Sequence, residues 1–423
     1  MEDSKCDLDE KNEATEAQVY VSQDAQRVIL AFLPGKAVVK FRRVCKFWRD
    51  CVEEPTFVDH HLNNAIRFYQ SIACFTSLDH GLAHMYTFDP TTLNFKSAEL
   101  VFSCRFQMSD PCNGLVCAYD LKGDADVLNP TTRKHLRLPV SEVKTQSLFS
   151  EYFVGFVRST KEYKVVSVRH QVRFLTFEIC DTGTLSWRTV RESADLLKTT
   201  KAVIVDDGMY WLLLHEASSV LSREILMLNL TDEKFSKVAI PDVVRNRDLQ
   251  LFEGDGKLHL LSTPVDAPYS AVPDIWVLDW TQQFWVQLKT VAHRVPVGMS
   301  PFFLCKMKIF YGNQYKLICR DLLDNTASYI NMPPGESLIS CGTFVESFAP
   351  AVKGLVDSTV ASYSSHLTES WPADPGPSVG GAGSSSTCPG QSSYIAGWSL
   401  ADLVQSFSRA KSTTNMEWKI CGK

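Results

Sequence analysis

Residues 22–49 read SQDAQRVILAFLPGKAVVKFRRVCKFWR, and this stretch decides how the first part of the chain folds. Its beginning predicts an amphipathic helix, because apolar residues recur at i, i+3, i+4, i+7 and i+8: Ala25, Val28, Ile29, Phe32 and Leu33. Ser22 is a suitable N-cap, and Asp24 in the first turn matches the helix dipole. Pro34 and Gly35 are expected to end this helix.

A second apolar set follows the Pro-Gly pair and predicts another helix, with most basic residues on its opposite face. Its members are Ala37, Val38, Phe41, Val44, Cys45 and Trp48. Pro55 is expected to end this helix, and a last short turn is expected over residues 57–62. Three helices within residues 21–64 form a weak core, since domains below about 40 residues usually need outside support. We therefore expect a partner protein to cover the exposed apolar surface.

The run Ile29–Arg49 resembles the F-box motif of plant F-box proteins, with its pattern I-L-x-x-L-P-x-K-x-x-x-x-F-R-x-V-C-K-x-W-R. Glu54–Phe57 and His61–Leu62 stand where that family has x-P-x-F and H-L. The chain departs from the family at Val21 and Ser22, which replace the usual Leu-Pro before the first helix. Val21 keeps an apolar contact, whereas the missing proline is expected to weaken docking.

This resemblance implies the substrate-recognition subunit of a Skp-cullin-F-box ubiquitin ligase, without catalytic residues. The helices would dock on a Skp-type adaptor and through it on a cullin, and a second domain would bind the target protein. The resemblance implies adaptor-binding roles for Val21, Ile29, Leu30, Leu33, Pro34, Val44, Cys45 and Trp48. If Trp48 is buried, Trp48→Ala should cost on the order of 3–5 kcal/mol and remove adaptor binding.

Charge is distributed unevenly over the N-terminal part of the chain. Residues 1–18 carry seven acids against two lysines, so residues 1–20 are expected to be a disordered acidic leader. Residues 27–49 carry seven basic residues and no acid, which favours an acidic partner. The alternative is a nucleic-acid regulator that reads DNA through Arg42, Arg43 and Lys46, but no second basic element accompanies them. We expect a protein partner and no nucleic acid.

Residues 65–354 repeat one unit, which is a strand, a turn rich in Asp, Asn, Pro and Thr, and a second strand. The spacings between successive copies are 40, 52, 48, 50 and 42 residues, and the six markers are Asp89, Asn129, Asp181, Asn229, Asp279 and Asp321. Two-residue hairpin turns are predicted upstream of three copies, at Asn113-Gly114, Asp207-Gly208 and Asp255-Gly256. Propeller blades span about 40–50 residues, so these six copies predict an all-β propeller of six blades. The expected fold is therefore a small all-α motif followed by this propeller.

Segments within residues 105–349 resemble, in order, the plant F-box-associated, kelch-like interaction domain; they cover residues 112–117, 129–139, 155–166 and 344–348. The strand Phe344–Phe348 is expected to close the ring by completing its first or last sheet. An unknown target protein is expected to bind loops at one end of the propeller, and residues 215–223 and 264–274 are the candidates.

The sequence lacks a G-x-S-x-G elbow, a P-loop, an H-E-x-x-H helix and a zinc-spaced Cys/His array. Neither a catalytic residue, a metal nor a cofactor is therefore predicted. His80 and His84 stand four apart, but a predicted hairpin lies between them, so ordinary loop histidines are favoured over a metal pair. The alternative is an enzyme in the propeller's central channel, which requires a convergent cluster of acids, histidines or arginines there.

The ends and the composition complete the prediction. No apolar stretch reaches the roughly 18 residues of a membrane helix, and the N-terminus is acidic, so a cytoplasmic or nuclear location with reduced thiols is expected. Residues 355–423 are expected to be a flexible tail, with a Pro-, Gly- and Ser-rich linker over 372–393. A short docking helix over 399–410 is possible by its apolar spacing, and an unpacked extension is the alternative.

Overall fold

The computed structural model describes residues 21–78, 82–93, 100–103, 107–120, 123–142, 149–171, 174–193, 196–197, 201–217, 220–265, 272–281, 283–290 and 299–350. The expected acidic leader, the expected tail with its linker and its helix over 399–410, and His80 lie outside the described residues.

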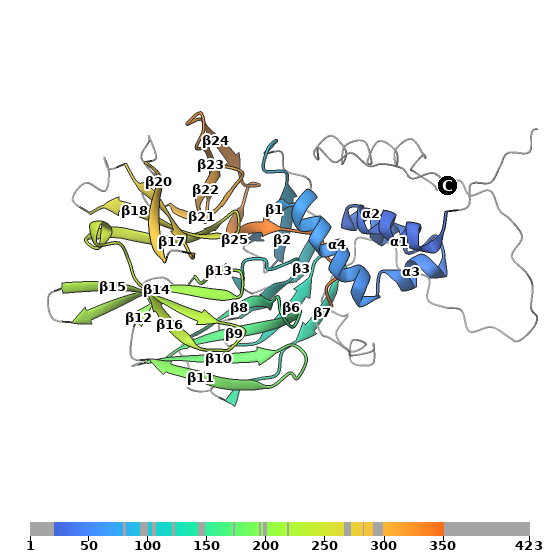
Figure 1. Ribbon diagram of the computed structural model, residues 1–423, viewed down its shortest axis with the longest axis horizontal. Coiled ribbons are helices and arrows are strands. Elements are labelled where there is room, and N and C mark those ends of the chain that lie inside the picture. The colour runs from blue at the N-terminus through green and yellow to red at the C-terminus, as the bar shows by residue number, and fades with distance from the viewer. Residues whose placement is uncertain are drawn as a thin grey trace, which may run out of the picture.

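Four helices form the N-terminal part of the chain, and the first begins where the sequence predicts. They are α1 (Gln23–Ala31), α2 (Gly35–Phe41), α3 (Lys46–Cys51) and α4 (Pro55–Phe68) (Figure 1). Ser22 caps α1, because its hydroxyl oxygen accepts a hydrogen bond from the backbone N–H of Ala25 at 3.3 Å. The first helix and its N-cap are therefore confirmed.

The rest of the helical prediction needs correction. The single helix expected after Pro34 is broken at residues 42–45 into α2 and α3, and the thiol of Cys45 caps α3 by accepting from the backbone N–H of Trp48 at 3.5 Å. Pro55 begins a helix instead of ending one, because a proline at the first helical position lacks only an N–H that has no partner there. The expected short turn is the 14-residue α4, which crosses the expected boundary at residue 64.

Among the described residues, the strands after α4 form five hydrogen-bonded sheets. The sheet β25-β1-β2-β3 consists of Glu336–Phe344, Ser71–Leu78, Leu82–Phe88 and Leu100–Ser103. The sheet β4-β5-β6-β7 consists of Gln107–Met108, Val116–Tyr119, Ala125–Asn129 and Lys134–Arg137. The sheet β11-β10-β9-β8 consists of Trp187–Ser193, Leu175–Asp181, Glu162–His170 and Phe149–Val157.

Two larger sheets complete the domain. The fourth contains β12 to β16, which are Leu196–Leu197, Val203–Val205, Gly208–Ala217, Val220–Asn229 and Phe235–Val238; the short 3₁₀ helix Asp242–Val244 follows. The fifth has the order β20-β19-β18-β17-β21-β22-β23-β24, with bounds Phe284–Thr290, Asp274–Asp279, Lys257–Pro264, Arg247–Gly254, Ser300–Cys305, Lys308–Asn313, Lys316–Asp321 and Ala327–Asn331. Within the sheet, its two antiparallel halves are joined by a short parallel pairing of β17 with β21.

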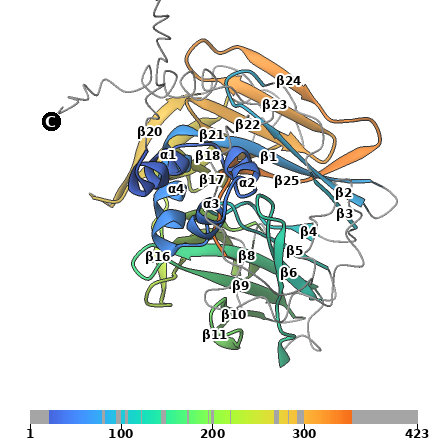
Figure 2. The same ribbon diagram turned by 90° about the vertical axis from the view of Figure 1, so that its right-hand side faces the viewer.

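Hydrophobic clusters lie between neighbouring sheets and hold them in a ring. Phe177 of β10 packs with Trp211 of β14, and Leu212 of β14 shares a cluster with Leu249 of β17. Figure 2 shows the helices in front of this ring, with β8 to β11 on one side and β21 to β24 on the other. Sheets packed face to face around an axis are the arrangement of a β-propeller, so the predicted all-α then all-β organisation is confirmed.

The ring closes by pairing its last strand with its first. β25 runs antiparallel to β1, and the thiols of the opposed Cys74 and Cys341 lie 3.1 Å apart. Burial raises the pKa of Cys341 well above its usual value, which keeps it a thiol. The closing strand predicted at Phe344–Phe348 is misplaced, because β25 ends at Phe344 and the following residues leave the sheet.

The six markers of the repeat share one turn geometry. In each copy the residue four positions after the marker has a φ of 53–61°; these residues are Leu93, Arg133, Leu185, Glu233, Gln283 and Asn325. In five copies the marker's side-chain oxygen also accepts from the N–H two residues on, the exception being Asp181. A polar turn followed by one left-handed residue is a common hairpin connection. The prediction of six recurring hairpins is confirmed.

Candidate functional site

The helices stand against one end of the ring. Gly35 lies beside Thr131 in the turn between β6 and β7, and Asp59 of α4 forms an ion pair with Lys161 in the turn between β8 and β9. Consecutive strands of a sheet are antiparallel, so successive connections alternate between the two ends of the ring. The β9–β10 and β14–β15 connections therefore lie at the end opposite the helices. The ring therefore has a helix-bearing end and a far end (Figure 1).

Residues 345–349, which we call the strap, join the helices to the ring. Phe348 is buried in the helical core and lies 4.8 Å from the His61 ring, edge to face. Glu346 accepts a hydrogen bond from the backbone N–H of Lys36 at 2.8 Å. Val345 packs on Leu62 of α4. One face of the helical motif is thus covered by its own chain, a contact that the sequence reasoning missed.

Two of the predicted adaptor-binding residues point into this helical core. Leu30 and Leu33 are buried together with Phe41, Phe57 and Phe348. Leu33 belonged to the apolar face predicted from the spacing, whereas Leu30 did not, and the other members of that face, Ala25, Val28, Ile29 and Phe32, are exposed or half-buried. The role of Leu30 and Leu33 in the described structure is to hold the helices together.

The remaining predicted residues reach the surface to different degrees. Val21 and Val44 are 39% and 46% exposed, and Cys45 is exposed as well. Ile29 and Pro34 are half-buried. Val28 is 55% exposed, and it was not among the expected contacts although the spacing of α1 had marked it as apolar. The helical part of the described structure therefore exposes Val21, Val28, Val44 and Ile66, and we call the first three the outward apolar surface.

Trp48 links the helices and is half-buried. Its ring packs edge to face on Phe41 at 5.4 Å, and its Nε1 donates to Gln26 of α1 at 2.6 Å. Because a half-buried ring loses less than a buried one, Trp48→Ala is expected to lower the free energy of unfolding by about 2 kcal/mol. Urea denaturation followed by helical circular dichroism measures this change. A loss below about 0.5 kcal/mol would contradict the packing role of this ring.

The basic run contains three side chains with ion-pair partners that can be named and four side chains that are exposed. Arg27 binds Glu54, Arg42 binds Glu53 at 2.9 Å, and Lys36 lies 3.5 Å from Glu346. The exposed cations are Lys40, Arg43, Lys46 and Arg49. Arg43 and Lys46 stand close to Val44 in the sequence, so this part of the motif is basic, which suits a protein partner of acidic character.

A polar cluster forms where inner strands of different sheets face one another. Asp110, between β4 and β5, accepts from Ser340 of β25 at 2.8 Å and lies 2.8 Å from the ammonium of Lys201. Lys201 also stands 4.9 Å from the centre of the Phe302 ring. Burial raises the pKa of nearby Glu253 to about 7. An enzyme in the central channel would require such a cluster, but here the charge of Asp110 already ties two sheets together.

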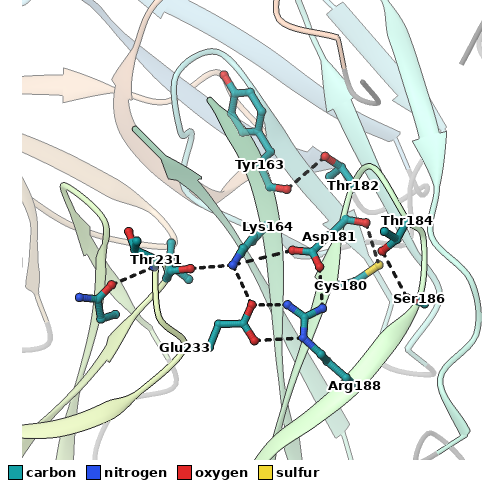
Figure 3. A network of polar contacts seen from close by, with 12 residues as sticks. Tyr163, Lys164, Cys180, Asp181, Thr182, Thr184, Ser186, Arg188, Thr231 and Glu233 are labelled. Atoms are coloured by element: carbon teal, nitrogen blue, oxygen red, sulfur yellow. Dashed lines mark hydrogen bonds and ion pairs between the residues drawn. The ribbon is translucent and has the colours of Figure 1, made fainter. Parts of the chain in front are cut away.

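A second charged network joins the third and fourth sheets (Figure 3). Lys164 of β9 binds Glu233 at 2.7 Å and donates to the carbonyl oxygen of Leu230 at 2.7 Å. Arg188 of β11 binds the same Glu233 and also Asp181, at 2.6 Å. The hydrogen bonds to Glu233 and Asp181 raise the pKa of Arg188. Both of these acids belong to repeat turns. The network is balanced in charge, which indicates a connection between sheets.

The described residues offer no metal site. His84 lies in β2, not in a loop as expected, and its Nδ1 is 2.8 Å from Glu336 of β25, which also accepts from Tyr86. Within the described ranges, His, Cys, Asp and Glu form no group of three arranged to hold a metal ion. Among the helices that the structure describes, none has the length and apolarity required to cross a membrane.

Comparisons with known proteins agree with this arrangement. Residues 22–60 match the model of the F-box domain, and residues 65–305 match that of the F-box associated beta propeller domain. An F-box/kelch-repeat protein of Arabidopsis thaliana is 26% identical over 73% of this chain and 79% of its own length. The F-box protein CPR1 of the same plant is 23% identical over 79% of this chain and 90% of its own.

Among solved structures, the oligogalacturonate lyase of Vibrio parahaemolyticus is 9% identical, with a TM-score of 0.39 over 61% of this chain and 78% of its own; this likeness is too low to carry an argument. The family models together reach from α1 to β21, over both the helices and the ring. The chain belongs to the F-box proteins that carry an F-box-associated β-propeller domain.

Proposed function

We propose that this chain is the non-catalytic substrate-recognition subunit of a Skp-cullin-F-box ubiquitin ligase. The observation that carries the proposal is the exposure of Val28 on α1 and Val44 between α2 and α3, in a helical motif seated at one end of a propeller. Apolar side chains that are exposed together on a small helical unit favour burial by a partner. Such a receptor accelerates ubiquitin transfer by holding the target near the ligase.

In this proposal the Skp-type adaptor covers the outward surface and brings the cullin with it. Val21, Ile29, Pro34, Val44, Cys45 and Trp48 remain the proposed contacts, and Val28 joins them. Leu30 and Leu33 support the contact from inside the helical core. Serine in place of proline at position 22 still caps α1, which argues that docking at this end of α1 is retained.

The target protein is proposed to bind at the far end of the ring. β18 ends at Pro264 and β19 begins at Asp274 at that end, and most of the candidate loop that joins them, residues 266–271, lies outside the described residues. The other candidate, residues 215–223, is mostly the outer part of the β14–β15 hairpin, which pairs through Ala217 and Val220. The outer strand β20, which runs from the helix-bearing end toward the far end, exposes Phe284, Val286 and Leu288, whereas the outer strands β7 and β16 carry exposed charges. Outer strands of natural sheets usually carry charges that prevent association. Because β20 carries apolar side chains instead, it is a suitable contact surface.

We further propose six blades, with the fifth sheet counted as two of four strands each, and a division at residues 1–20, 21–64, 65–354 and 355–423. The weak parallel joint between β17 and β21 supports the count, and the extent of α4 argues for moving the second boundary to residue 68. Residence in the cytoplasm or nucleus is supported by the described cysteines, all of which are free thiols.

The test uses the full chain and a purified Skp-type adaptor. Val44→Asp and Val28→Asp each place a charge on the outward surface, and each is expected to weaken adaptor binding at least tenfold, about 1.4 kcal/mol, without changing the melting temperature. Tyr329→Asp on β24, which is also exposed but lies on the ring, is the matched control. Isothermal titration calorimetry measures the affinities.

Two outcomes would contradict the proposal. One is a wild-type chain that stays folded and does not bind the adaptor at micromolar concentration. The other is adaptor binding that survives both aspartate substitutions, together with DNA binding that falls steeply as the salt concentration rises. That result would favour the nucleic-acid alternative.

A further inference from the structure

We propose that the strap makes the F-box an inseparable part of the propeller, with Phe348, Glu346 and Asn129 acting as positioning residues that fix the adaptor-docking helices on the closed ring. This inference rests on the proposed function, because it concerns how the docking surface is held. It adds that the helices fold fully only when β25 closes the ring.

On the helical side, the strap supplies a missing piece of the core. Phe348 contacts the rings of Phe57 and His61 at centroid distances of 6.1 and 4.8 Å. Glu346 caps α2, which begins without a side-chain cap of its own, by accepting from the N–H of Lys36. A Cβ added at Gly35 would lie only 2.6 Å from the Cβ of Glu346, so the approach is too close for any larger residue. The helices thus lack both an aromatic and a cap without the strap.

On the ring side, the strap is held by one buried amide. The Nδ2 of Asn129, which is buried, donates to the carbonyl oxygens of Ser347 and Ala349 at 3.1 and 2.8 Å. Its Oδ1 accepts from the N–H groups of Thr131 and Thr132 and so builds the repeat turn. Gly114 has a φ of 86° and lies against Ser347 so closely that a Cβ there would meet its Oγ at 2.3 Å. Asn129 therefore both forms its repeat turn and binds the strap.

The chain leaves little slack between ring closure and the helical core. Phe344 is the last residue of β25, and Phe348 is four residues later, a path of at most about 14 Å when extended. Separating β25 from β1 would therefore withdraw Phe348 from the helices. Conversely, unfolding of the helices would expose Phe348 and release one end of the closing strand. Each event destabilises the other, which is the meaning of coupled local unfolding.

The test is hydrogen–deuterium exchange on the full-length chain, with two variants of the strap. Phe348→Ala removes the aromatic, and Asn129→Asp keeps the Oδ1 acceptor of the turn while removing the two donations to the strap. Both variants are expected to speed exchange at least tenfold in α1 to α4 and in β25, and to weaken adaptor binding. The β9–β10 pairing, which lies elsewhere in the ring, should keep its protection.

Asn229→Asp is the matched control, because Asn229 caps the equivalent turn of another copy and its Oδ1 accepts from Thr231 in the same way. It should leave the helices unchanged. Helices that keep wild-type protection in both Phe348→Ala and Asn129→Asp would overturn the inference, even if the wild type binds the adaptor. A wild type without adaptor affinity, but with loosened helices in both variants, would instead overturn the proposed function and support the strap.

Discussion

Replacing Arg169 with Met is expected to lower the free energy of unfolding of the propeller by about 3–5 kcal/mol, because it leaves Glu178 as a buried charge without its partner. The two side chains are 0% and 3% exposed and lie on the adjacent strands β9 and β10. Arg169 also donates to the hydroxyl of Ser150 at 3.0 Å. Removing one member of a buried, hydrogen-bonded pair costs far more than the pair contributes as a whole.

The measurement is urea denaturation followed by strand circular dichroism, with Arg188→Met as the control. Arg188 is 38% exposed in the network of Figure 3, so its loss is expected to cost roughly 1 kcal/mol or less. The double variant Arg169→Met/Glu178→Leu should recover most of the lost stability, since it removes the unpaired charge. A double variant as unstable as the sum of both single variants would contradict this explanation.

The sequence predicted the parts of this fold that depend on local chemistry. Markers such as Asn129 revealed the repeats, because in five of the six copies an Asp or Asn side chain builds its own turn within two residues. Ser22 likewise located the start of α1 through a contact of three residues. The break between α2 and α3 contains neither glycine nor proline, so periodicity alone continued one helix through it.

The candidate site was only partly predictable, because its geometry depends on distant contacts. Leu33 and Val44 are both apolar, and only the packed structure shows that the first lies inside and the second outside. Phe348 is separated from Phe57 by 291 positions, and no local pattern links them. The cluster around Asp110 and Lys201 combines segments from several sheets in the same manner. Long-range packing of this kind leaves no periodic signal in one sequence.

His61 gives the second large effect, which depends on pH. Its ring is buried between Phe57 and Phe348, and its Nε2 contacts the carbonyl oxygen of Leu33 at 3.0 Å. Burial lowers the pKa of His61 to about 4, whereas an unfolded histidine titrates near 6.5. Below pH 6.5 the unfolded chain therefore binds a proton that the folded chain does not. This contribution to stability is complete above pH 6.5 and decreases as the pH falls toward 4.

The size of the loss follows from the two pKa values. Between pH 7 and pH 4 the His61 contribution should decrease by about 3 kcal/mol, at about 1.4 kcal/mol for each pKa unit. The whole-protein curve will not isolate it, because the pKa of buried His259 is also lowered to about 4 and that of Glu253 is raised to about 7. Glu253 acts in the opposite direction, since its folded form takes up a proton first as the pH falls.

The difference between wild type and His61→Gln removes these shared terms. Gln can still donate to the Leu33 carbonyl oxygen but does not titrate, so the wild type should lose about 3 kcal/mol relative to the variant between pH 7 and pH 4. Helical circular dichroism during urea unfolding at each pH gives this difference. Because Phe348 packs edge to face on the same ring, the loss should be accompanied by faster exchange in β25. Parallel stability curves for the two proteins would mean that His61 is solvated, and the strap would then not seal the helical core.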